Sequence, residues 1–200
     1  MNVDITLPDG SVRNYESPVT GYQIAESIGP RLLKDAICVE IDNKFQDLSF
    51  EISENINIRI VTTKDLDALH ILRHSSAHIL AQAVLNLYPN AQFGVGPSIE
   101  NGFYYDFLFE TPIKENELEN IEKEMKRIAK SAQSLIRSEI TKKDAKKIFK
   151  NQKLKLELIE SAESDEGVGE EIVSTYTNDE FIDLCMGPHV PSTSILKHFK

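Results

Sequence analysis

The fold begins with VDITLPDGSVRNY at residues 3–15, where apolar and polar residues alternate on both sides of a turn. Val3, Ile5 and Leu7 fall on one face of a strand, because side chains alternate with a period of two. Pro8-Asp9-Gly10 then supplies the residue types that tight turns favour. This stretch predicts an N-terminal β-hairpin.

The sequence up to residue 62 completes a small mixed unit. Residues 20–28 predict a short helix that ends at Gly29-Pro30. Residues 37–41 and 57–61 predict further strands, and Cys38 is expected to be a buried apolar residue. A hairpin, a helix and more strands in this order are typical of the ubiquitin-like β-grasp fold. We therefore expect a β-grasp domain at residues 1–62.

A long helix is predicted from Asp67 to Tyr88. Successive residues turn by about 100° in a helix, which places His74 and His78 on an arc away from the Leu/Ile stripe. These histidines are expected to face solvent or a cleft. Small Ala77 and Ala81 beside them are expected to leave room for a substrate.

The remainder predicts an α/β domain at residues 63–200. Its expected elements are a Gly-rich strand–turn–strand at 92–109, a helix at 115–131 that continues to about 137, a helix at 142–151, a strand or helix end at 154–159, an acidic loop at 163–171, and segments at 173–176 and 180–184. We expect a sheet packed on helices in this domain. The predicted fold class of the whole chain is α+β.

Composition predicts a soluble, cytoplasmic protein with no membrane association. The chain has 200 residues, of which 40% are hydrophobic, and only two cysteines. The formal net charge of −10 argues against a nucleic-acid partner. However, residues 121–156 carry 12 Lys and Arg against 4 Asp and Glu. This basic segment is either an RNA-backbone contact or a solvated helix face.

Two pairs of side chains indicate the chemistry. His74 and His78 lie four positions apart on the predicted helix, and Cys185 and His189 flank a Gly-Pro turn. Together they form a legitimate tetrahedral zinc set, or a metal-free pocket in which a neutral imidazole is the general base. The HExxH metalloprotease pattern is absent from the sequence. The two remaining histidines are expected at the surface: His70 and His198.

Three motifs carry a resemblance to a known family. They are His74-Ser75-Ser76-Ala77-His78, the segment GFYYDF at 102–107, and the segment DLCMGPHVP at 183–191. They resemble the editing domain of bacterial threonyl-tRNA synthetases, and residues 1–62 resemble the TGS domain that precedes it there. Alanyl-tRNA synthetase editing domains share the HxxxH and CxxxH patterns but lack the preceding TGS domain.

The resemblance implies hydrolysis of serine wrongly attached to the 3'-terminal adenosine of threonine tRNA. In this family pattern His74 acts as base on the attacking water. Asp183 orients the serine amine or a histidine. Lys155, with Lys153 as the fallback, stabilises the developing oxyanion. The remaining implied residues shape the pocket or contact the substrate: His78, Cys185, His189, Tyr104 and Gly96.

Several expectations stay open from the sequence. We expect no cofactor in these residues; the alternatives are a zinc-dependent editor of the alanyl type, with zinc on His74, His78, Cys185 and His189, and a non-catalytic RNA-binding module. Met186 stands where the family usually carries Arg. The resemblance implies a dimeric full-length enzyme that ligates threonine to its tRNA with ATP, magnesium and zinc in a later domain. These 200 residues are expected to lack ligation activity and are compatible with a monomer.

Overall fold

The computed structural model describes residues 1–161 and 172–199. The chain divides into two compact units. Unit 1 comprises residues 1–72 and 187–191, and unit 2 comprises residues 73–186 and the end of the chain from residue 192. The domain boundary that the sequence places at 62/63 stays a prediction. The predicted acidic loop at 163–171 lies outside the described residues.

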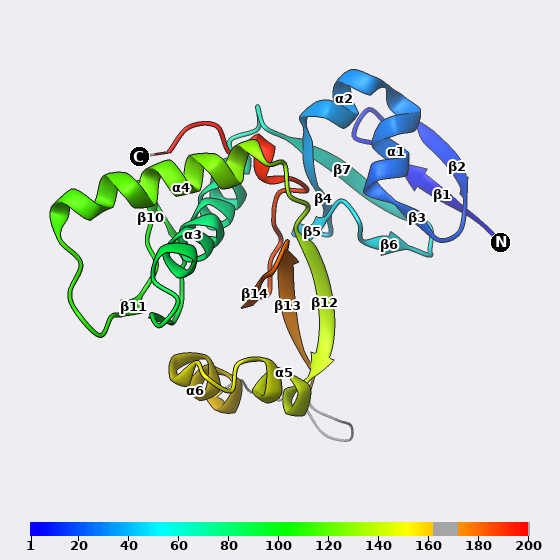
Figure 1. Ribbon diagram of the computed structural model, residues 1–200. Helices are drawn as coiled ribbons and strands as arrows, with labels where there is room; N and C mark the ends of the chain where they lie inside the picture. Colours follow the sequence, from blue (N-terminus) through cyan, green and yellow to red (C-terminus); the bar gives the residue numbers. More distant parts are fainter. Residues whose placement is uncertain (162–171, 200) are drawn as a thin grey trace. The chain divides into compact units, whose positions relative to one another are not determined.

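Unit 1 contains a mixed five-stranded sheet in the order β2-β1-β7-β4-β5, with α1 and α2 beside it (Figure 1). Strands β1 and β7 pair in parallel, and the other neighbours are antiparallel. The elements are β1 (Asn2–Thr6), β2 (Val12–Glu16), β3 (Val19–Thr20), α1 (Gly21–Ile28), α2 (Pro30–Asp35), β4 (Ala36–Ile41), β5 (Lys44–Asp47), β6 (Glu51–Ile52) and β7 (Ile56–Thr62). This arrangement is the β-grasp fold expected from the sequence.

The local sequence explains the unit's elements. Thr20 caps α1 in a capping box with Gln23, which satisfies backbone N–H groups of the first turn. Ile5 and Ile24 are fully buried where β1 and α1 meet in one apolar cluster. Cys38 is buried as predicted, and this burial raises the pKa of its thiol to about 12. The sequence did not predict α2 or β5.

Unit 2 is organised around helix α3 and an antiparallel sheet in the order β12-β13-β14. Two short two-stranded ladders, β8 with β11 and β9 with β10, connect α3 to α4 along the chain. The elements are α3 (Ala68–Leu87), β8 (Gln92–Phe93), β9 (Ser98–Ile99), β10 (Gly102–Phe103), β11 (Phe107–Leu108), η1 (Glu115–Glu117), α4 (Leu118–Lys130), β12 (Ile136–Thr141), α5 (Lys142–Ile148), α6 (Lys153–Ser161), β13 (Ile172–Asn178), β14 (Phe181–Leu184) and η2 (Thr193–Ile195).

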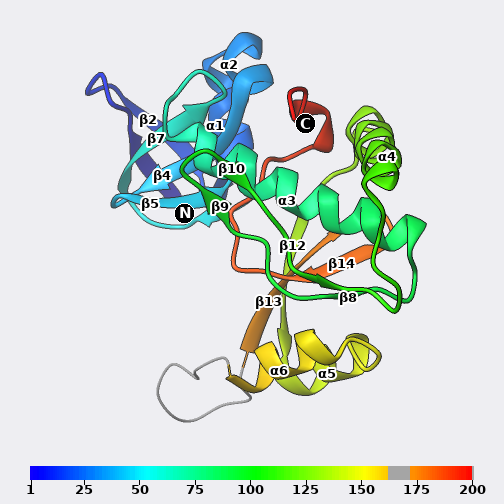
Figure 2. The same cartoon turned by 90° about the vertical axis from the view of Figure 1, so that its left-hand side faces the viewer.

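One apolar core joins α3, α5, α6 and β14. Figures 1 and 2 show α5 and α6 together at one end of β12 and β13. Phe93 of β8 lies 6.4 Å from Phe149 and 5.8 Å from Phe181, measured between ring centroids. Ala81 of α3 and Ile159 of α6 are fully buried in the same cluster. This packing fixes α6 relative to α3 and β14.

One sequence prediction in this unit was wrong, and one that was left open is now decided. The helix predicted to reach residue 137 ends at Lys130, because Ala132 takes a φ of 53° that a right-handed helix cannot accommodate. Residues 136–141 form β12 instead and pair with β13. The segment 154–159, which the sequence left open between strand and helix, belongs to α6.

Among residues 1–161 and 172–199, none of the helices combines the length and apolar character that a membrane span requires.

The position of α6 depends on its buried face. We expect Ile159→Ala to lower the free energy of unfolding by about 2–5 kcal/mol, because it leaves a cavity between α5, α6 and β8. Urea denaturation followed by circular dichroism measures this change. Glu157→Ala, an exposed position on the same helix, is the control and should change stability by less than about 0.5 kcal/mol. Equal effects would mean that α6 is not anchored by this core.

Candidate functional site

A cavity of about 320 Å³ in unit 2 brings together most of the titratable side chains that the sequence singled out. Its walls come from α3, the Gly-rich segment at 95–97, Tyr105, α6 and the end of β14. His74, His78, Lys155, Asp183 and Cys185 all line it. Segments far apart in the sequence therefore converge on one pocket, at the lower end of the size range of ligand sites.

The floor of the pocket is a buried ion pair. Lys155 and Asp183 have side chains only 1% and 5% exposed, and Lys155 Nζ lies 2.5 Å from Asp183 Oδ1. Lys155 Nζ also donates to the Gly94 carbonyl oxygen at 2.6 Å and to Tyr105 Oη at 2.9 Å. These two hydrogen bonds and the ion pair hold the ammonium group in place. Lys155 therefore supplies a fixed positive charge in this arrangement.

Tyr105 forms the wall next to this pair. Its hydroxyl donates to Asp183 Oδ2 at 2.6 Å, and the ring lies against Gly96. A Cβ at residue 96 would come within 2.1 Å of Tyr105 Cδ2, so only glycine fits beneath this ring. Burial, reinforced by the adjacent Asp183 carboxylate, raises the pKa of Tyr105 and keeps the hydroxyl protonated as a donor.

His78 is held by a buried amide network. Its Nε2 lies 2.6 Å from Asn178 Oδ1, while Asn178 Nδ2 donates to Gln82 Oε1 at 2.7 Å and to Gln133 Oε1 at 2.9 Å. Because the amide nitrogen is used by the two glutamines, its oxygen faces His78, and Nε2 must be the protonated ring nitrogen. Nδ1 is then the unprotonated nitrogen, 3.8 Å from Asp183 Oδ2.

Burial controls the charge of His78. The side chain is 2% exposed, and this desolvation lowers its pKa to about 4, although the Asp183 carboxylate opposes the shift. His78 is therefore neutral at physiological pH. The ring of Phe181 packs edge-on against it at 4.9 Å between centroids.

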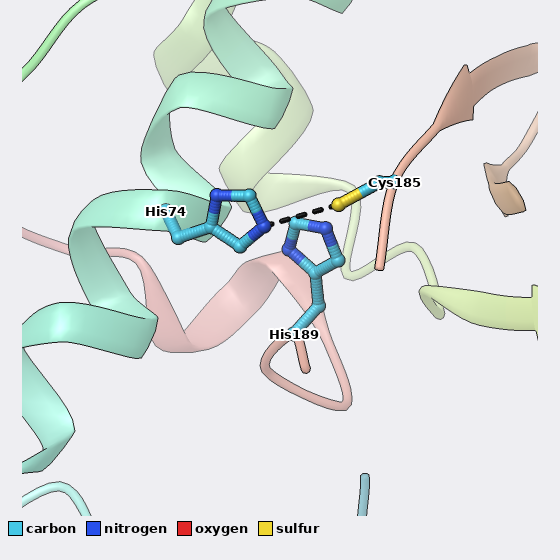
Figure 3. A group of neighbouring side chains, drawn as sticks. All are labelled: His74, Cys185 and His189. Atoms are coloured by element: carbon cyan, nitrogen blue, oxygen red, sulfur yellow. Dashed lines mark hydrogen bonds between the residues drawn. The ribbon is translucent and has the colours of Figure 1, made fainter. Parts of the chain in front are cut away.

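His74 and Cys185 form a second, partly exposed pair. His74 Nε2 and Cys185 Sγ lie 3.0 Å apart, a hydrogen bond drawn as the dashed line in Figure 3. His74 projects from α3, and Cys185 follows β14, where its backbone N–H donates to the Ser174 carbonyl oxygen at 3.1 Å. Both side chains line the same cavity as His78 and Asp183. His74 and Cys185 thus form a titratable pair at the more accessible part of the cavity.

Other predicted residues fall outside this pocket lining. Tyr104 is 45% exposed and is not among the residues that line the cavity, whereas Tyr105 is. Lys153 is exposed at the start of α6, so Lys155 is the lysine of the pocket. His189 lies on the 187–191 segment of unit 1, where its backbone N–H donates to Asp47 Oδ1 at 3.0 Å; its part in the site stays a prediction.

The space for a substrate that the sequence analysis expected beside Ala77 and Ala81 is filled by other side chains. Ala77 and Ala81 are fully buried and do not line the cavity; Ala81 packs in the core with Phe93. The arc of the helical wheel was right for His74 and for the direction of His78, but it could not show that other segments cover His78. The sequence analysis also missed Tyr105, Asn178 and Gln82. For Tyr105 the sequence did contain a signal, because period-two alternation puts it on the same face as Phe107.

The donor geometry bears on the zinc alternative. Zinc bonds to a nitrogen at about 2.0 Å and to a thiolate at about 2.3 Å would hold two tetrahedral ligand atoms about 3.5 Å apart. The 3.0 Å between His74 Nε2 and Cys185 Sγ matches a hydrogen bond better. In addition, Nε2 of His78 is engaged by Asn178. Three of the four predicted ligands, His74, His78 and Cys185, are thus engaged in hydrogen bonds.

The ion pair yields a stability prediction. We expect Lys155→Met to lower the free energy of unfolding by about 3–5 kcal/mol, because the variant leaves the Asp183 carboxylate buried without its counter-charge. Chemical denaturation measures the loss, with Lys153→Met on the exposed part of the same helix as control. Adding Asp183→Asn to Lys155→Met should recover part of it. Additive losses in the double variant would contradict a direct pairing.

His78 yields a pH prediction. Its pKa is about 4 when folded and about 6.5 when unfolded, so between these values the unfolded chain binds a proton that the folded chain does not. This group should therefore make stability fall by about 3 kcal/mol as pH decreases from 6.5 to 4. Denaturation midpoints across this range, compared with those of His78→Gln, isolate the contribution. The exposed His198→Gln serves as control, and a variant slope equal to that of the wild type would refute the assignment.

Comparison with known proteins agrees with this architecture. Residues 3–62 match the TGS domain model, and residues 173–200 match the model described as the threonyl and alanyl tRNA synthetase second additional domain. Threonine–tRNA ligase of Francisella philomiragia is 48% identical over 200 residues, which is 99% of this chain and 31% of that protein. The threonine–tRNA ligases of Ralstonia nicotianae and Burkholderia multivorans are 46% and 48% identical, with the same coverage.

The chain spans 31% of the length of these curated relatives. Its two matched models occur in the order that the resemblance predicted, with the TGS domain first and the synthetase-associated domain second. Over nearly its whole length, the chain is therefore similar to a part of these threonine–tRNA ligases.

Proposed function

We propose that the pocket of unit 2 hydrolyses the ester that joins a wrongly attached serine to the 3'-terminal adenosine of threonine tRNA. The observation that supports this most directly is the convergence of His74 and Cys185 with the buried Lys155–Asp183 pair on one small cavity. The relatives are named threonine–tRNA ligases, whose synthetic chemistry creates the need for such a step. Threonine tRNA is accordingly the proposed partner.

The chemical need follows from the size of serine. Serine lacks one methyl group of threonine, and a site that binds threonine gains only about 1–3 kcal/mol from that methyl. A second, smaller pocket can admit serine and exclude threonine by the same group. The cavity of about 320 Å³ is small enough for the aminoacyl ester to contact several walls at once.

The hydrolytic step uses His74 as the base. A water molecule gives one proton to the imidazole while its oxygen bonds to the ester carbonyl carbon. When the carbon–oxygen bond to the ribose breaks, the imidazole returns this proton to the ribose oxygen, so that free serine and a tRNA 3'-hydroxyl are formed. In the free protein the Cys185 thiol is hydrogen-bonded to His74 Nε2 at 3.0 Å. When the substrate is bound, the attacking water replaces the thiol as the partner of His74 Nε2.

The buried groups position the substrate. Asp183 uses one oxygen for Lys155 and the other for Tyr105, and a carboxylate has about four lone-pair sites, so it retains capacity to accept from the serine ammonium group. The positive charge of Lys155 stabilises the negative oxygen that develops when water adds to the ester carbonyl. His78 lines the same cavity as a neutral imidazole. All of this chemistry proceeds without a metal ion in our proposal.

A deacylation assay on the chain tests this function. We expect His74→Ala to slow the hydrolysis of seryl-tRNA about 10²- to 10⁴-fold, the usual contribution of a general base. His70→Ala, an exposed histidine one turn earlier on α3, is the matched control and should keep the wild-type rate. Threonyl-tRNA should be spared by the wild-type chain.

Three results would contradict the proposal. An unchanged rate in His74→Ala removes this side chain from the chemistry. Stoichiometric zinc in the purified protein, with activity lost to a chelator, would establish the metal-dependent alternative instead. No hydrolysis of either tRNA by the wild-type chain would leave only the binding function.

A further inference from the structure

The strand β12 forms one edge of the antiparallel sheet of unit 2 (Figure 1). Among the described residues, all of its ladder partners belong to β13, so its opposite side has no neighbouring strand. The first four residues of β12 are solvent-exposed, and Ile136 is 59% exposed. The unpaired backbone N–H and C=O groups of such an edge are a template for pairing with another strand.

The exposed part of β12 carries two charges of opposite sign, two positions apart. Arg137 Nη1 lies 2.8 Å from Glu139 Oε1, and the two side chains are 38% and 59% exposed. Charged residues at a sheet edge commonly prevent association with other chains. One positive and one negative charge at this spacing still attract the same two charges in the reversed order. A second copy of β12 that runs antiparallel presents that reversed order.

An antiparallel pairing centred on Ser138 is self-complementary. It places Arg137 opposite Glu139 of the second copy, and the two-fold axis repeats this contact. Directly opposite residues have Cβ atoms about 4.5–5.5 Å apart, which is close enough for an ion pair between long side chains. Each charge then has an opposite charge beside it on its own strand and another across the interface.

Other alignments of the two strands are less favourable. Identical antiparallel strands can shift past each other only in steps that keep each side chain on its face. The two nearest registers of this kind place Arg137 opposite Arg137 or Glu139 opposite Glu139, and like charges directly opposite each other are destabilising. A parallel, in-register pairing makes both of these contacts at once. The two charges therefore select one alignment.

The other face of β12 supplies an apolar contact in the same alignment. Ile140 lies on this face and packs against the core cluster that contains Phe149 and Phe181. Ile136 lies on the same face, because side chains alternate along a strand. In the pairing centred on Ser138, Ile136 of each copy lies opposite Ile140 of the other. The exposed Ile136 is thereby covered beside an existing apolar core, which is favourable.

We propose that β12 is a self-association edge, through which two copies of this chain join their sheets into one continuous antiparallel sheet. The alignment pairs Arg137 of each copy with Glu139 of the other. The inference is independent of the proposed hydrolysis, because neither residue lines the pocket. Pairing along one short strand buries little surface, so the association is weak and depends on concentration.

Charge reversal tests this alignment. Arg137→Glu gives an edge with two negative charges, and Glu139→Arg gives an edge with two positive charges. Each variant alone should dimerise at least about tenfold more weakly than the wild type, because both cross-strand pairs become repulsive. Lys123→Glu, an exposed charge reversal on α4, is the control and should associate as the wild type does. Sedimentation equilibrium at concentrations up to about 1 mM measures the dissociation constants, and circular dichroism checks the fold of each variant.

An equimolar mixture of the two variants separates pairing across the interface from pairing within one strand. Neither chain in the mixture retains the contact between residues 137 and 139, but each supplies the charges that the other lacks. We expect the mixture to recover most of the lost affinity as a heterodimer. A wild-type chain that stays monomeric up to about 1 mM overturns the proposal. A mixture no stronger than its components, or single variants that dimerise as the wild type does, also overturns it.

Discussion

The site depends on placing one positive and one negative charge inside an apolar core. Neither Lys155 nor Asp183 is tolerable there alone, because an isolated buried charge loses several kcal/mol of hydration. Their 2.5 Å contact ties α6 to β14, and the Tyr105 hydroxyl and the Gly94 carbonyl oxygen bring the Gly-rich segment to the same point. One interaction thus assembles three separate parts of unit 2 around a cavity.

Two histidines of one helix acquire different properties from this assembly. His78 is enclosed by Asn178 and Phe181, which fixes its tautomer and keeps it neutral. His74, one turn earlier, stays partly exposed and contacts the Cys185 thiol. Different surroundings commonly give two chemically identical groups different pKa values and therefore different roles.

The sequence predicted the elements whose signals are local. The hairpin at residues 3–15 and the long helix with His74 and His78 rest on alternation and helical period, and the structure contains both. Lys155 and Asp183 came from a family resemblance, since nothing local marks a lysine for burial. The substrate contact assigned to Tyr104 stays a prediction, and it is the next residue, Tyr105, that lines the cavity. Asn178 has no local signal, because its role exists only when β13 lies beside α3.

A pocket that separates serine from threonine needs walls that do not move. The methyl difference amounts to about 1–3 kcal/mol, and a wall that yields at low energetic cost would lose that discrimination. Tyr105 meets this requirement, because its hydroxyl bonds Asp183 and Lys155 while its ring rests directly on Gly96. Relaxing the wall would require breaking hydrogen bonds to two buried charged groups. The buried ion pair that assembles the site is therefore also the feature that makes its shape rigid.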